Sequence, residues 1–173
     1  MNPLLSDSAL PRYDEIRPEH VAEAVDRMVE AVEAGLAAIE SDPRPASWAT
    51  VIEELNTLED WFTKVWSPVS HLNVVRNEPA LREAYQAAQP KVVALGLKIG
   101  QSAALYAKLV SIQGGAEWQK LDAGQKRSIE QRILSAKLSG IALAGEKKER
   151  FNKIAEERSQ LATKFTDNVL DAT

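Results

Sequence analysis

The side chains best suited to chemistry lie in one short segment, Trp66-Ser-Pro-Val-Ser-His-Leu-Asn-Val-Val-Arg-Asn77. Within it, His71, Asn73 and Arg76 offer hydrogen-bond donors and acceptors of the kind that bind a peptide backbone. The mixture of bulky apolar groups, rigid proline and polar groups indicates a fixed tertiary setting. Two interpretations stay open: these side chains contact a bound ligand, or they anchor a bend by bonding to nearby backbone, as polar groups beside turns commonly do.

The other titratable side chains give weaker signals for catalysis. His20 lies in the first turn of a predicted helix, where a solvated or capping role is expected. The carboxylate pairs Asp14-Glu15 and Glu53-Glu54 are adjacent in sequence, and adjacent residues of a helix do not face each other. With no cysteine and no His-Glu-x-x-His motif, the chain offers neither a thiolate nor a helical zinc site. The sequence therefore predicts no catalytic, cofactor-binding or metal-binding residue.

The composition is typical of one globular domain that folds around a single core. The chain has 173 residues, of which 45% are hydrophobic and 27% charged, and its net charge is −4. This charge leaves no extended basic surface for a phosphate backbone, so a nucleic-acid partner is not expected. The N-terminus lacks the basic start and long apolar run of a signal peptide. Together with the absence of cysteine, this predicts a cytoplasmic protein.

The elements that must position these side chains are predicted to be helices almost throughout, with no substantial sheet. Proline, glycine and capping residues divide the chain at several points, most clearly where Asp122 and Gln125 form a capping box and where Ser139-Gly140 ends that helix. The expected helices run over residues 18–41, 47–67, 78–113, 122–138 and from 145 onward. We expect Pro68 to end the second and Pro90 to bend the third. The prediction is an all-α, bundle-like single domain over residues 1–173, with about six principal helices.

The most apolar stretch runs from Val92 to Val110 and could be mistaken for a membrane span. Lys98 and Lys108 interrupt it, and a charged residue near the middle of a spanning helix costs about 2.5–3.5 kcal/mol on insertion scales. We therefore expect a buried helix at the centre of the domain and no membrane partner. Gly96 and Gly100 would let another helix approach closely.

The last helix carries an apolar stripe of Phe151, Ile154, Leu161, Phe165 and Val169, which we expect to be buried. The apolar pattern continues almost to Thr173 with no glycine or proline to end the helix. We therefore expect the natural polypeptide to continue. A chain that stops here should expose an apolar patch near Phe165, Val169 and Leu170 and could self-associate through it.

The aromatic residues could form a binding platform, but their spacing favours core packing. Trp48 and Phe62 fall on the apolar stripe of the second predicted helix, and Trp61 and Trp66 flank it. We expect these side chains to pack inside the domain.

Several short sequence segments, in this order, resemble the N-terminal part of the oligopeptidase A branch of the thimet oligopeptidase family. The resemblance covers essentially the whole chain. Its specificity comes from the occurrence of all the segments in the same order along the chain. They are Asn2-Pro-Leu-Leu, Leu10-Pro-Arg-Tyr-Asp-Glu-Ile, Pro18-Glu-His-Val, Trp66-Ser-Pro-Val-Ser-His-Leu-Asn, Gly100-Gln, Gln125-Lys, Leu138-Ser-Gly-Ile, Glu146-Lys-Lys and Asn168-Val-Leu-Asp-Ala-Thr.

The resemblance implies a domain of a zinc metallopeptidase that cleaves short peptides inside a deep channel. The family's zinc helix, with its His-Glu-x-x-His motif, has no counterpart among these residues, so no catalytic role can be carried over. The implied function is one wall of the channel, with His71, Asn73 and Arg76 as possible lining residues. The implied partners are the missing catalytic domain and short peptide substrates, with zinc bound by the parent enzyme and not by this fragment.

A second hypothesis is a self-contained helical module that binds a partner helix or peptide through an apolar groove. The sequence after Thr173 separates the two hypotheses. An open reading frame that reaches a His-Glu-x-x-His motif favours the peptidase, and a stop codon favours the module.

Overall fold

The fold, taken from a computed structural model that describes residues 1–8, 10–76 and 78–172, is all-α. No strand occurs in these ranges, and the prediction of about six principal helices is confirmed. The six are α1 (Glu19–Ser41), α2 (Glu54–Val75), α3 (Pro79–Gly100), α4 (Ala103–Gly114), α5 (Ala123–Leu138) and α6 (Gly145–Asp171). The described ranges also contain three short helical segments: η1 (Pro3–Leu5), η2 (Trp48–Glu53) and η3 (Ala116–Lys120).

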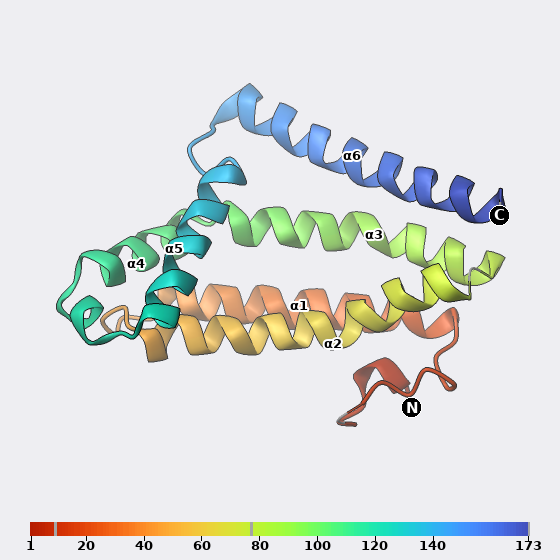
Figure 1. Cartoon of the computed structure of the whole chain (residues 1–173), viewed down its shortest axis with the longest axis horizontal. Coiled ribbons are helices and arrows are strands. Elements are labelled where there is room, and N and C mark those ends of the chain that lie inside the picture. Colours follow the sequence, from red (N-terminus) through yellow and green to blue (C-terminus); the bar gives the residue numbers. More distant parts are fainter. Residues whose placement is uncertain (9, 77, 173) are drawn as a thin grey trace.

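The long helices run side by side and alternate in direction (Figure 1). α1 packs against both α2 and α3, and α6 lies along α3 on the side away from α1 and α2. α4 and α5 pack on each other at one end of this layer, and the N-terminal segment packs against α1 and α2 near the other end. α1 is therefore the central helix of the domain.

The core forms two apolar clusters arranged along α1. One joins the first half of α1 to α2 and α3, and the other joins its second half to η2, α4 and α5. Leu58 and Ile99 pack against both clusters and connect them. The stripe expected on the first helix is confirmed as buried; it consists of Val21, Val25, Met28, Val32, Leu36 and Ile39.

Pro68 does not end the second helix, so that prediction was wrong. α2 continues to Val75 with Pro68 inside it, and the last part of the helix changes direction (Figure 1). A proline inside a helix costs about 3 kcal/mol because a backbone hydrogen bond is lost and the ring clashes with the preceding turn. Val69 and Leu72 are buried just beyond it, and each buried aliphatic side chain contributes about 1.5–3 kcal/mol. Tertiary packing thus offsets the local cost.

The long apolar stretch from Val92 to Val110 is not one central helix, which corrects a second prediction. It divides between α3 and α4 at Gln101 and Ser102, and Pro90 lies inside α3. The Ser102 hydroxyl accepts a hydrogen bond from the Leu105 backbone N–H (3.0 Å) and donates one to Glu40 of α1 (2.5 Å). Ser102 therefore caps α4 and ties it to α1.

None of the helices in the part of the chain that the structure describes has the length and apolar character of a membrane span.

The two glycines of this stretch differ in their surroundings. A Cβ on Gly100 would lie 2.8 Å from the Ser139 hydroxyl oxygen, so the close approach expected at this position is confirmed. A Cβ on Gly96 would meet no atom within 4 Å, and the close approach expected there was wrong.

Both ends of α5 and the start of α6 follow the sequence prediction. Asp122 and Gln125 form the expected capping box at the start of α5. Gly140 closes that helix with φ of +82°, a left-handed conformation that glycine adopts without steric cost. α6 begins at Gly145, as expected.

Replacing Gly140 with alanine is expected to lower the free energy of unfolding by about 1–2 kcal/mol, because the left-handed conformation costs an L-residue that much. The new Cβ would also lie 2.9 Å from a methyl carbon of Leu143. The matched control is Gly96→Ala in the exposed part of α3, which should raise the stability by about 0.5–1 kcal/mol. Urea unfolding curves of both variants check the result, and equal effects at the two sites would contradict the assigned conformation.

Candidate functional site

Of the possible lining residues, His71 and Asn73 lie on the last turns of α2, and Arg76 is the residue that follows its end. The His71 side chain is exposed, and its ring centroid lies 5.3 Å from that of Tyr13. Asn73 is only 4% exposed, and its Oδ1 has no hydrogen-bond partner among the described residues. Arg76 is exposed and pairs with Glu78, whose Oε1 lies 2.6 Å from Nη2.

These three side chains do not converge on one point. At about 100° per residue, Asn73 leaves the helix roughly 200° around from His71. The structure therefore gives the three residues different surroundings: an exposed ring, a buried amide and an exposed ion pair. Their contact with a substrate stays a prediction.

His20 has a local structural role at the start of α1. Its Nδ1 accepts a hydrogen bond from the Arg17 backbone N–H (3.1 Å). Its backbone carbonyl accepts another from Nδ2 of the buried Asn2 (2.8 Å). His20 thus makes local contacts at the start of the helix, where a solvated or capping role was expected, and its carbonyl helps to hold the N-terminal segment on the domain.

The residues that the structure describes do not come together as a ligand set for the zinc ion that the resemblance implies for the parent enzyme. Within the described ranges, no three or more His, Cys, Asp or Glu side chains lie together in a way that could hold a metal ion. Of the two histidines, His20 is engaged at a helix start and His71 lies against Tyr13. No chemical step is therefore assigned to zinc at these residues.

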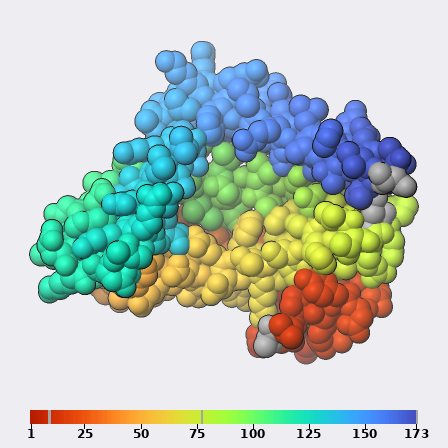
Figure 2. Space-filling model, in the orientation of Figure 1, coloured from red at the N-terminus to blue at the C-terminus, as the bar shows by residue number. Residues whose placement is uncertain are grey.

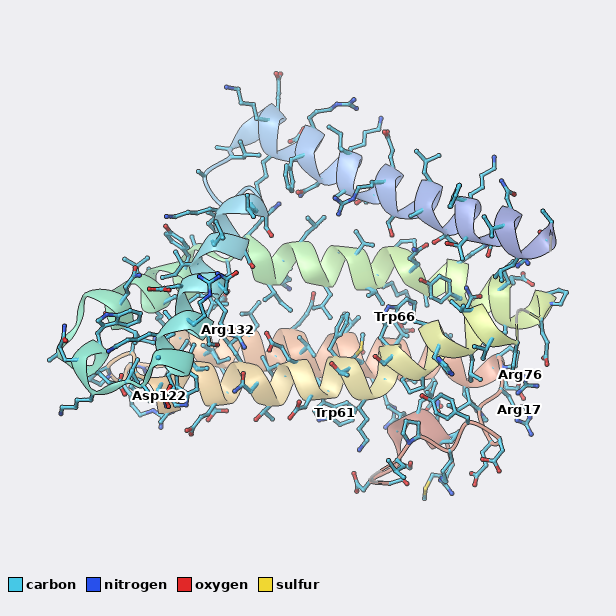
Figure 3. The ribbon with its side chains drawn as sticks, viewed as in Figure 1. Arg17, Trp61, Trp66, Arg76, Asp122 and Arg132 are labelled. Carbon is cyan, nitrogen blue, oxygen red and sulfur yellow. The ribbon has the colours of Figure 1, made fainter. Side chains whose placement is uncertain are left out.

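Trp48, Trp61 and Trp66 pack against the core, as their spacing predicted, although each is only partly buried. Trp66 stacks on Tyr85 of α3 with a ring-centroid distance of 4.9 Å, and Figure 3 shows it between α2 and α3. Trp61 also packs on the first cluster, and Trp48 and Trp118 pack on the second. These aromatic side chains are partly buried supports of the core and do not gather into one platform.

A hollow of about 250 Å³ lies where α5 crosses α2 and α3 (Figure 2). Apolar side chains line most of it, and the guanidinium of Arg132 lies at its wall. Arg132 binds both carboxylate oxygens of Glu59, and its Nη2 also donates to Asn56 (2.9 Å). This ion pair holds α5 on α2, so the guanidinium is already engaged within the domain.

α6 contacts α3 through polar side chains, which we call the polar seam. In this seam Arg82, Gln86 and Gln89 of α3 face Ser159, Thr163, Asp167 and Asp171 of α6. Arg82 donates to both carboxylate oxygens of Asp171 (2.9 and 2.7 Å), and these bonds lower the pKa of Asp171. Gln86 donates to Asp167 (2.8 Å) and Gln89 to Thr163 (2.7 Å). A cavity of about 430 Å³ lies along the seam.

Most of the apolar side of α6 faces outward, so the prediction that it is buried was wrong for all of its residues except Phe151, which is half-buried. We call Ile154, Leu161, Phe165 and Val169 the outer stripe. Leu161 and Phe165 are 66% and 71% exposed, and Ile154 and Val169 are each nearly half exposed. Thr163 and Asp167, on the opposite side of the helix, are buried in the polar seam. Of the residues expected to form an exposed patch, Phe165 and Val169 are exposed and Leu170 is half-buried.

The polar seam was not predicted from the sequence. The available signal was the spacing of Arg82, Gln86 and Gln89 at i, i+4 and i+7, which places three long polar side chains on one face of a helix. The same spacing of four separates Ser159, Thr163, Asp167 and Asp171.

A protein-family model described as Neurolysin/Thimet oligopeptidase, N-terminal domain, matches residues 25–148 of the chain. Three relatives are similar over 172 residues, which is 99% of this chain. Organellar oligopeptidase A, chloroplastic/mitochondrial, of Arabidopsis thaliana is 38% identical, and the probable cytosolic oligopeptidase A of the same plant is 37% identical. Oligopeptidase A of Salmonella typhimurium is 35% identical. The chain spans only 22%, 24% and 25% of the length of these relatives, respectively.

Proposed function

Because the chain belongs to the neurolysin/thimet oligopeptidase family and matches its N-terminal domain, we propose that it is the non-catalytic N-terminal part of an oligopeptidase A-like peptidase. The complete enzyme hydrolyses short peptides and depends on zinc. This part forms one wall of its substrate channel. In this proposal residues 1–173 form a single domain.

The observation that carries the proposal is the match along the whole chain to proteins that are much longer. Relatives named oligopeptidase A align over 99% of this chain, which accounts for at most 25% of their own length. The chain contains only two histidines and no His-Glu-x-x-His motif. We therefore assign the zinc ligands, and the glutamate that would act as general base, to residues beyond Thr173.

The work of this domain is the selection of substrates. A wall of packed helices excludes folded proteins from a channel by its shape and admits short, extended peptides. The helical layer of α1, α2 and α3, with its two apolar clusters, supports this role because it is packed along its length. Of the possible lining residues, His71 and Arg76 have exposed side chains that a substrate could reach, whereas the buried Asn73 suits a packing role.

The partners in this proposal are the catalytic part of the same polypeptide and short peptide substrates. The acidic net charge of −4 gives no reason to expect nucleic acid. The cytoplasm is the proposed location, as for the relative described as probably cytosolic.

A second function, favoured by the exposed outer stripe of α6, is a self-contained helical module. The residues of the stripe follow one another at spacings of seven, four and four, which place them on one face of the helix, as in helices that dock into an apolar groove. Such a module would need no downstream catalytic residues and would bind its partner as a separate protein.

The length of the natural polypeptide decides between the two. Since this chain covers 22% to 25% of its relatives, the peptidase proposal predicts a polypeptide roughly four times as long, with a His-Glu-x-x-His motif after Thr173. The intact mass of the protein purified from its source, together with the downstream coding sequence, measures this. A natural protein that ends near Thr173 would favour the separate module and overturn the proposal.

A further inference from the structure

We propose that the outer stripe of α6 is the surface on which the later part of the same polypeptide docks, through an apolar patch that carries a carboxylate opposite Arg158. This inference rests on the proposed function, and it adds the interface through which the domain holds its catalytic partner.

The orientation of α6 is the first support. A surface helix normally turns its apolar stripe toward the core and its polar side toward water. α6 does the reverse, and the polar seam fixes its rotation through the Arg82–Asp171 and Gln89–Thr163 bonds, among others. Rotating the helix to bury Leu161 and Phe165 would break these bonds and expose Thr163 and Asp167. α6 lies along one edge of the molecule (Figures 1 and 2), and the domain therefore leaves the stripe exposed.

Arg158 specifies the chemistry of the partner. It is exposed and lies between Ile154 and Leu161 along the stripe, at the i+4 position from Ile154. Arg158 forms no ion pair with any residue that the structure describes. Covering the stripe would remove this guanidinium from water, which is costly unless a carboxylate binds it. The docking surface is therefore apolar with at least one aspartate or glutamate, which can accept two parallel hydrogen bonds from an arginine.

The position of α6 in the chain identifies the occupant. In a polypeptide as long as the relatives, α6 would lead directly into the remaining residues. A segment joined to the end of a helix is present at high effective concentration beside it and can dock without the entropy cost of a free partner. The later part of the polypeptide is thus a better occupant than a separate protein or a second copy.

The test uses cysteine labelling, since residues 1–173 contain no cysteine of their own. Phe165→Cys and, as a control, Lys153→Cys place single thiols on α6, the first on the stripe and the second on an exposed position away from it. A maleimide labels each variant in the 173-residue chain and in the complete polypeptide. Mass spectrometry of the peptide that contains the new cysteine gives the labelling rate.

We expect the thiol of Phe165→Cys to react with the maleimide at least about tenfold more slowly in the complete polypeptide than in the 173-residue chain. In the complete polypeptide the thiol is covered, so it can react only when the interface opens locally. Lys153→Cys should react at similar rates in both. Equal rates for Phe165→Cys would overturn the inference. Protection that disappears when the complete polypeptide is diluted would assign the stripe to a second copy and would also overturn it.

Two variants of Arg158 test the required carboxylate. In the complete polypeptide with Phe165→Cys, Arg158→Glu should restore fast labelling because two carboxylates would meet in the interface. Arg158→Lys should retain most of the protection. Unchanged protection in Arg158→Glu would overturn the carboxylate part of the inference.

A peptidase assay on the same preparations separates this inference from the function on which it rests. A complete polypeptide that cleaves short peptides but leaves Phe165→Cys fully reactive refutes the interface alone. A complete polypeptide with no peptidase activity refutes the proposed function whatever the labelling shows.

Discussion

Met28→Ala is expected to lower the free energy of unfolding of the 173-residue chain by about 2–5 kcal/mol, the usual cost of truncating a buried methionine or leucine. Met28 is 0% exposed and lies in the middle of α1, the helix that both α2 and α3 cover. Its removal leaves a cavity in the first apolar cluster, where Val25, Val65 and Val69 are equally buried. This is a large fraction of the total stability of a typical domain. Denaturant unfolding followed by circular dichroism measures it.

Leu161→Ala is the matched control, because it also shortens an apolar helical side chain but at a site that is 66% exposed. Its effect on the isolated chain should stay within about 0.5 kcal/mol, as for most surface substitutions. A loss at Leu161 as large as that at Met28 would mean that the outer stripe is buried in solution, and the orientation of α6 described above would be wrong.

The helices and their boundaries could be predicted from sequence wherever a local signal decides them. The capping box at Asp122, the helix end at Gly140 and the buried stripe of α1 depend on residues close together in the chain, and the structure has all three. The class of the fold followed from the same signals, because a period near 3.6 residues recurs along nearly the whole chain.

Two helix boundaries were predicted wrongly, for different reasons. Pro68 looked like a helix end, but Val65, Val69 and Leu72 keep the helical period across it, and their burial stabilises the continuous helix. The break before α4 depends on Ser102, whose bond to Glu40 joins positions far apart in sequence. Ser102 as a helix cap was the available signal, and the apolar run around it concealed that signal.

The orientation of α6 could not be predicted from periodicity at all. A hydrophobic pattern shows which residues share a face but not which neighbour covers it. Here the polar side chains of α3, from Arg82 to Gln89, attract the polar side of α6. The separation of His71, Asn73 and Arg76 has a related cause, since their grouping in sequence suggested one site before the helix through Pro68 was known.

The second large effect concerns activity, and it is expected to be all or none. The isolated 173-residue chain should hydrolyse no peptide and hold no stoichiometric zinc, because its two histidines, His20 and His71, have separate roles and its sequence lacks the zinc-binding motif. The complete polypeptide should cleave the same short peptides, because it would add the zinc ligands and the general base. Adding this chain in excess to the complete enzyme should supply no further turnover.

The proposed non-catalytic role of this chain is therefore tested most directly by one paired measurement on chelator-washed protein. Zinc content and cleavage of a quenched fluorogenic peptide are measured for the 173-residue chain and for the complete polypeptide. We expect no bound zinc and no turnover for the chain, and tightly bound zinc with chelator-sensitive turnover for the complete polypeptide. Turnover by the isolated chain that a chelator abolishes, or a complete polypeptide that binds no zinc and cleaves nothing, would contradict it.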